Sequence, residues 1–136
     1  MRADFRFLSV EDVEHFHTDQ IERHGGSRAP GHRGPTEGVA AAVAAVANSY
    51  YDDVFELAAA YAVYIVMGHV FGDGNKRTGC AAMLTFLRLN GVRIVAPAPM
   101  LRDWMLDLQT KAESDPRPQA SDLVDWVAGR LRAHRR

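Results

Sequence analysis

The sequence predicts an all-α fold of about six helices, packed as a single domain over residues 1–136. A length of 136 residues suits one domain and hardly two. Hydrophobic residues make up 47% of the chain, enough for an ordinary core, and they recur mostly at helical spacing. The one stretch in which apolar and polar residues alternate, residues 92–97, is too short and isolated to form a sheet.

The first helix is expected to begin after Ser9 and to end at Gly25. Asp12 follows Ser9 at a spacing like that of a capping box, and glycine commonly terminates helices. One face of this helix is traced by Val13, Phe16, Gln20 and Ile21. His15 and His17 point about 200° apart on such a helix, so they cannot share a metal ion there.

A loop rich in Gly, Pro, Ser and Arg is expected over residues 25–36, before the second helix. That helix begins with Pro35 and Thr36, since proline suits a first helical turn. Its apolar positions at helical spacing are Val39, Val43 and Val46. Asp53 can then cap a third helix that runs to about Gly68.

The third helix lies in a long apolar stretch, residues 54–71, that approaches the length of a membrane span. Glu56 and His69 interrupt the stretch, so a helix buried on nearly all sides is expected instead. A fourth helix is predicted from Asn75 to about Asn90. Two more are predicted over residues 99–114 and 121–135, separated by a proline-containing loop.

Composition excludes several classes of protein. The formal net charge of −1 argues against binding nucleic acid or an acidic membrane through bulk charge, so neither is expected as a partner. The first residues lack a basic region followed by a long apolar one, and a cytoplasmic location is expected. A single cysteine, Cys80, cannot form an intrachain disulfide, and its apolar neighbours favour a packing role over a nucleophilic one.

Polar residues gather where the third and fourth helices meet, in the stretch "GHVFGDGNKRTGCAAML", residues 68–84. The N–H groups of a first helical turn lack partners and carry partial positive charge, and Gly72 and Gly74 leave room for an anion to approach them. Lys76 and Arg77 add cations in that turn, where each is unfavourable by about 0.3–1 kcal/mol unless an anion compensates.

Two further side chains in this stretch suit phosphate chemistry. Asp73 offers a carboxylate for a hard cation such as Mg²⁺ shared with phosphates, and His69 can take a proton near neutral pH. The spacing is not that of a Walker loop. The residues therefore fit a phosphate and metal cradle with a base beside it, although they also fit a polar connection whose charges face water.

The segment "HVFGDGNKRT", His69 to Thr78, resembles the central motif of the Fic/Doc family, H-x-F-x-x-G-N-x-R. Lys76 makes it similar to the Doc, or death-on-curing, branch, whose motif contains N-K-R. The stretches "HGGSRAPGHRGPTEG" and "TFLRLNGV" are also similar to Doc, so the likeness covers most of residues 5–95. The resemblance implies a compact helical Fic fold.

The resemblance also implies a role for each motif residue. His69 matches the catalytic histidine that takes the proton from a target hydroxyl, and Phe71 the residue that anchors the loop in the core. Asp73 matches the acidic position that holds Mg²⁺. Gly74 and Asn75 match the anion-binding turn, with Asn75 orienting the phosphates.

Arg77 matches the phosphate-binding arginine of the family, and two other positions depart from its adenylylating members. Lys76 stands where those relatives have Gly, and Cys80 where they have a second Arg. In the Doc branch the nucleotide is turned around, so the resemblance implies a kinase that uses ATP and Mg²⁺ to phosphorylate elongation factor Tu or a similar translation factor. Two alternatives stay open: AMP transfer by the same base, and a catalytically silent binding module.

The family likeness also suggests partners. Doc-like toxins are silenced by a separate Phd-like antitoxin, and a groove between apolar helices would receive it. In the family, the loop region before the second helix positions the target protein. Ser27, Arg28 and Arg33 are therefore candidate target-binding residues.

Overall fold

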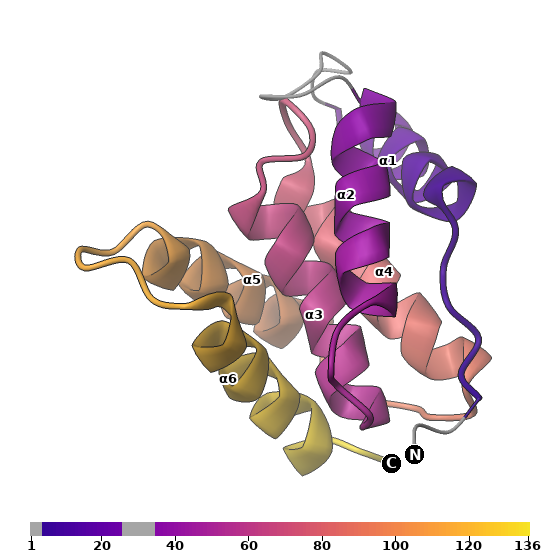
Figure 1. Cartoon of the computed structure of the whole chain (residues 1–136), viewed down its shortest axis with the longest axis vertical. Coiled ribbons are helices and arrows are strands. Elements are labelled where there is room, and N and C mark those ends of the chain that lie inside the picture. The colour runs from indigo at the N-terminus through magenta and orange to yellow at the C-terminus, as the bar shows by residue number, and fades with distance from the viewer. Residues whose placement is uncertain (1–3, 26–34) are drawn as a thin grey trace.

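The computed structural model describes residues 4–25 and 35–136, and it contains six helices and no strand in those residues (Figure 1). The all-α prediction is thus confirmed. The helices are α1 (Val10–His24), α2 (Pro35–Ala47), α3 (Val54–Met67), α4 (Asn75–Leu89), α5 (Ala98–Ala112) and α6 (Ala120–Ala133). Ser27, Arg28 and Arg33 lie outside the described residues.

The start of α1 is held by the capping box that its sequence predicts. The Ser9 hydroxyl accepts the Asp12 N–H at 3.1 Å, and the Asp12 carboxylate accepts the Ser9 N–H at 2.8 Å. Two first-turn donors are thereby satisfied reciprocally. The helix ends at Gly25, whose φ of 77° is open to glycine at little cost. Its buried face contains Val13 and Ile21 as expected, and also His17.

The central element of the fold is α3, which packs against α2, α4, α5 and α6 (Figure 1). Asp53 caps it by accepting the Glu56 N–H at 3.1 Å, as predicted. Ten of its 14 residues are buried, because helices cover it on several sides and its many alanines let them approach closely. The expectation of a buried helix is confirmed. None of the described helices has the length and apolarity that a membrane crossing requires.

The predicted extended stretch, residues 92–97, pairs with the end of the chain. Ile94 and Arg135 form an isolated antiparallel bridge, and the Val95 N–H donates to the His134 carbonyl at 2.8 Å. The stretch forms no sheet in the part of the chain that the structure describes. This contact ties the segment after α4 to the segment after α6.

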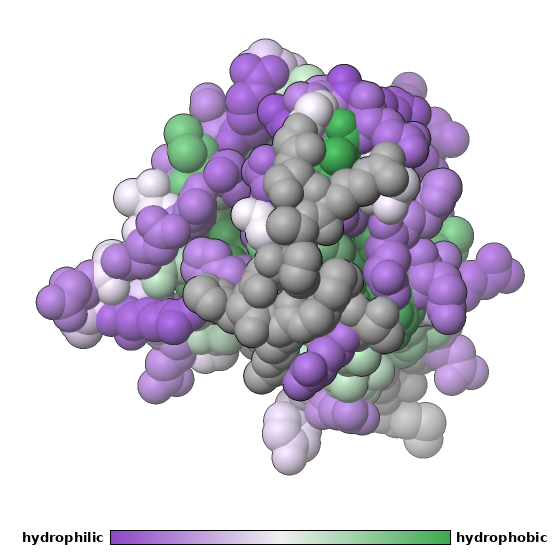
Figure 2. Space-filling view, turned by 90° about the horizontal axis from the view of Figure 1, so that it is seen from above, coloured by the Kyte–Doolittle hydropathy of each residue, from purple (hydrophilic) through white to green (hydrophobic). Residues whose placement is uncertain are grey.

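The loop that follows α3, residues 68–74, lies at the upper end of the molecule in Figure 1. Residues of α1 and α2 flank it: His17 bonds the Asp73 carbonyl, and the backbone of Gly38 lies against Val70. Seen from above in Figure 2, the described part of this end is largely hydrophilic, with isolated hydrophobic residues between. Helices α1 and α2 thus support a polar loop at the surface.

Candidate active site

His69 stands in an unusual backbone conformation directly after α3. Its φ is 45°, in the left-handed region that residues with a Cβ rarely adopt, and it is the one non-glycine residue with positive φ in the described chain. Such strain is kept only where the surrounding structure imposes it, and it is common at functional sites. The side chain of this half-buried residue borders two adjoining cavities.

Phe71, the expected loop anchor, is 3% exposed and packs into the core. Its ring lies parallel to the imidazole of His17, with centroids 3.7 Å apart and an interplanar angle of 2°. His17 Nε2 also lies 2.8 Å from the carbonyl oxygen of Asp73, so this nitrogen carries the proton and donates. One histidine of α1 therefore holds the loop at two points, through stacking and through a hydrogen bond.

Asn75 closes the loop from its other end. Its Oδ1 accepts the Phe71 N–H at 3.0 Å, and its Nδ2 donates to the Phe71 carbonyl at 2.8 Å. Both ends of the side-chain amide are therefore committed to the loop backbone. The phosphate contact expected of Asn75 stays a prediction, and in this arrangement its backbone N–H is the group available to make it.

Gly74 precedes α4 in a conformation that needs glycine. Its φ is 80°, and an added Cβ would come within 3.3 Å of Ile21 Cδ1 and 3.4 Å of His17 Cδ2. No side chain caps α4, and its first turn contains no acidic residue. The partial positive charge at the start of α4 is therefore not neutralised from within the helix.

Lys76 and Arg77 extend this positive region. Lys76 Nζ donates to Oε1 of Gln109, on α5, at 2.6 Å, while Arg77 is exposed. A cavity of about 150 Å³ lies between the loop and α5; its lining residues include His69, Asp73, Gly74 and Lys76. Lys76, the start of α4 and the candidate base His69 thus border one small space, and Arg77 is not among its lining residues.

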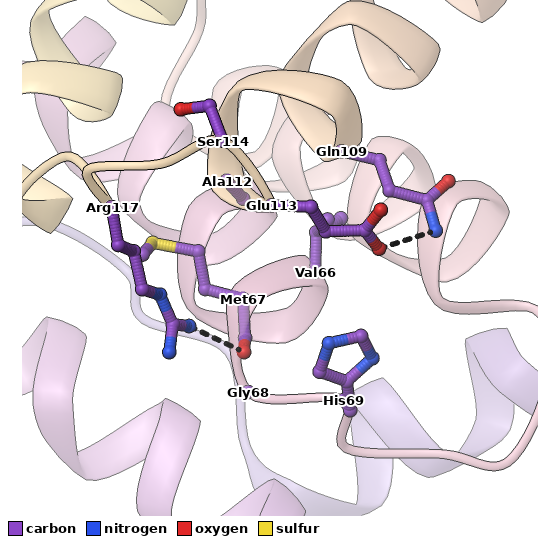
Figure 3. A pocket seen from close by; sticks show the side chains of 9 residues that line it. All are labelled: Val66, Met67, Gly68, His69, Gln109, Ala112, Glu113, Ser114 and Arg117. Atoms are coloured by element: carbon purple, nitrogen blue, oxygen red, sulfur yellow. Dashed lines mark hydrogen bonds between the residues drawn. The ribbon is translucent and has the colours of Figure 1, made fainter.

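A larger cavity of about 430 Å³ adjoins the small one (Figure 3). Val66, His69 and Gln109 line both cavities. On the far wall, Arg117 donates to the Met67 carbonyl at 3.3 Å. The volume of the larger cavity falls in the range of about 300–1,000 Å³ that is usual for small-molecule sites.

Asp73 offers a carboxylate of the kind that holds Mg²⁺ at phosphate-transfer sites. The residue is exposed on the loop, and its Oδ1 accepts the Gly74 N–H at 2.8 Å, which orients the carboxylate. Within residues 4–25 and 35–136, no three His, Cys, Asp or Glu side chains form a group that could hold a metal ion. Mg²⁺ is often held by one or two carboxylates together with substrate phosphates and water, so a single carboxylate fits the ion when a nucleotide is bound.

Cys80 lies on α4 and is partly buried against the core. Burial raises the pKa of its thiol to about 11, because a thiolate would be poorly solvated there. The thiol is therefore protonated at neutral pH, and the thiolate is the nucleophilic form. This agrees with the packing role expected from its apolar neighbours.

His17 and Gln109 belong to the site, although sequence reasoning did not place them there. Helical spacing excludes a metal ion shared by His15 and His17, yet His17 stands four residues from both Val13 and Ile21, on the apolar face of α1. That spacing was a usable signal for a buried histidine. Gln109 carries no such signal, because its contact with Lys76 joins residues 33 positions apart.

Comparisons with known proteins show the family to which the chain belongs. The sequence model described as "Fic/DOC family" matches residues 7–87, which include the loop and nearly all of α4. The chain is 38% identical over 99 residues to "Protein kinase doc" of Escherichia phage P1, a match that covers 72% of this chain and 78% of the phage protein. It is 35% identical over 80 residues to "Toxin Doc" of Mycolicibacterium smegmatis, covering 57% of this chain and 61% of that protein. The chain belongs to the Fic/Doc family.

Proposed function

We propose that this chain is a Doc-type toxin that transfers the γ-phosphate of ATP to a hydroxyl of a protein. The names of its two relatives, a protein kinase and a toxin, support this proposal. The observation that carries it is the small cavity in which His69, Lys76 and the open start of α4 meet. Elongation factor Tu, or a similar translation factor, is the proposed acceptor.

In the proposed reaction the protein mainly positions groups and neutralises charge. The N–H groups at the start of α4, with Lys76 and Arg77, bind the phosphates. His69 accepts the proton of the acceptor hydroxyl as its oxygen forms a bond to the γ-phosphorus. The bond from that phosphorus to the β,γ-bridging oxygen breaks, and ADP leaves. Mg²⁺, held by Asp73 and the phosphates, would supply additional charge neutralisation.

Two side chains favour phosphate transfer over AMP transfer. The Lys76 side chain lines the small cavity and reaches Gln109 on α5, where a glycine would leave open space. Cys80 packs against the core as a neutral thiol and provides no second cation for distal phosphates. These features leave Lys76 and Arg77 as the cations of the first turn of α4.

The position of a radioactive label tests this function. The purified chain is incubated with elongation factor Tu, Mg²⁺ and ATP labelled at either the α- or the γ-phosphorus. Label is expected on the acceptor from the γ position, and the His69→Ala variant should lose at least about a hundredfold in rate if His69 is the base. His15→Ala, which alters an exposed histidine of α1, is the matched control and should retain the activity. Transfer from the α position alone would instead establish AMP transfer.

We also propose a cytoplasmic location and regulation by a short Phd-like antitoxin. The support for the antitoxin is the toxin name of one relative. Expression of the chain alone should arrest growth, and co-expression with the antitoxin should relieve the arrest and yield a complex that co-purifies. Relief of the arrest without a stable complex would contradict this mode of regulation.

A further inference from the structure

A row of three hydrogen-bonded side chains crosses from the start of α4 to the end of α5. Lys76 Nζ donates to Gln109 Oε1 at 2.6 Å, and Gln109 Nε2 donates to Glu113 Oε1 at 3.2 Å. Lys76 and Gln109 are partly buried, and Glu113 is exposed directly after α5. The row therefore begins at the phosphate end of the candidate site and ends in solvent.

Gln109 stands where the two cavities adjoin. It lines both of them, whereas Lys76 lines the smaller one and Glu113 the larger one. Figure 3 shows Gln109 and Glu113 joined at the rim of the larger cavity, with His69 below them. The Lys76–Gln109 bond consequently places the ammonium group at the wall of the small cavity, across from the loop that contains His69.

The chemistry of the row determines which way the amide faces. A lysine ammonium can only donate and a carboxylate can only accept, so the Gln109 oxygen must face Lys76 and its nitrogen must face Glu113. Because the amide is neutral, Lys76 keeps its full positive charge toward the cavity. A glutamate at this position would instead place an opposite charge against the ammonium.

We propose that Gln109 is a positioning residue that holds the Lys76 ammonium ready for a nucleotide phosphate. The inference rests on the proposed function. A lysine side chain has many rotamers, and holding it near its binding position beforehand reduces the freedom lost when the ligand arrives. Gln109 acts through Lys76, and Glu113 fixes the orientation of the amide.

A double-mutant cycle on ATP binding tests this role. Dissociation constants for ATP with Mg²⁺ are measured for the wild type, Gln109→Ala, Lys76→Ala and the double variant. We expect Gln109→Ala to weaken binding about fivefold, and Lys76→Ala to weaken it by more. In the Lys76→Ala background, Gln109→Ala should change the constant by less than about twofold, because the side chain through which Gln109 acts is absent.

Two further variants separate positioning from a general effect on α5. Thr110→Ala alters the neighbouring exposed residue, whose hydroxyl bonds its own helix, and it should leave ATP binding unchanged. Gln109→Glu keeps the shape of the side chain and should weaken ATP binding more than Gln109→Ala does, most strongly at low salt. Thermal unfolding of each variant checks that the fold is retained.

The outcomes distinguish this inference from the proposed function. If the wild type does not bind ATP with Mg²⁺, the proposed function fails and the role of Gln109 fails with it. If the wild type binds ATP but Gln109→Ala binds equally well or more tightly, the inference alone is overturned. Equal losses from Gln109→Ala with and without Lys76 would overturn it as well.

Discussion

At the scale of single residues, the loop before α4 is held by contacts that leave little freedom. Asn75 bonds both backbone groups of Phe71, and His17 stacks on the Phe71 ring while donating to the Asp73 carbonyl. The strained backbone of His69 is part of this arrangement. These contacts place a candidate base and a candidate metal ligand at the same cavity.

His17 is predicted to act on the site without touching a substrate. His17→Ala removes both the ring stacking and the hydrogen bond, and it should lower the free energy of unfolding by about 1–3 kcal/mol. His17→Phe keeps a ring against Phe71 but leaves the Asp73 carbonyl without its donor. His17→Phe should therefore lower the free energy of unfolding by less than His17→Ala does. It should nevertheless clearly lower the rate of phosphate transfer. Chemical denaturation and the label-transfer assay measure the two effects.

The exposed His15, on the same helix, provides the control for His17. His15→Ala should change neither the free energy of unfolding nor the transfer rate appreciably, because surface substitutions usually have small effects. If His17→Phe transferred phosphate as fast as the wild type, the hydrogen bond to the Asp73 carbonyl would have no part in arranging the loop.

At the scale of the elements, the close contact of α3 with α4 holds the two helices that the loop joins. Gly79 of α4 is buried against α3, and an added Cβ would lie 3.3 Å from Ala62 Cα and 3.4 Å from the Ala62 carbonyl oxygen. Both of these are backbone atoms, so they cannot move aside as a flexible side chain would. The packing of α3 on α4 thus depends on the absence of a side chain at Gly79.

Two helical glycines should respond oppositely to enlargement. Gly129, in α6, is exposed and has no atom within 4 Å of an added Cβ, so Gly129→Ala should stabilise the fold by about 0.5–1 kcal/mol through helix propensity. Gly79→Val should destabilise it by about 1–3 kcal/mol, because it forces α3 and α4 apart. Urea denaturation of both variants measures the difference, and a Gly79→Val protein as stable as the wild type would contradict the close packing.

At the scale of the whole molecule, the segment before α1 is bonded to the central helices. The Tyr61 hydroxyl of α3 accepts the Leu8 N–H at 2.9 Å, and burial raises the pKa of this hydroxyl to about 12. Asn90 bonds the N–H and the carbonyl of Arg6. Because these contacts join the segment before α1 to α3 and to the end of α4, they stabilise the helix pair that supports the loop.

The ends of several helices and the position of the candidate site could be predicted from local sequence. The capping box at Ser9, the cap at Asp53, the stop at Gly25 and the polar loop before Asn75 each depend on residues a few positions apart. Interactions of such short range leave a pattern in the sequence, and these patterns located the helices and the candidate site. The motif from His69 to Thr78 carries the family likeness, which a match over residues 7–87 supports.

Contacts between distant segments depended on tertiary structure. His17 meets Asp73 across 56 positions, and Lys76 meets Gln109 across 33. Neither pair leaves a periodic signal, because each depends on how α1 and α5 pack around α3 and α4. The sequence by itself therefore determined that this protein has helices and a polar loop before α4. Packing of the helices decided which side chains hold that loop and its lysine in place, because only folding brings those groups within hydrogen-bonding distance.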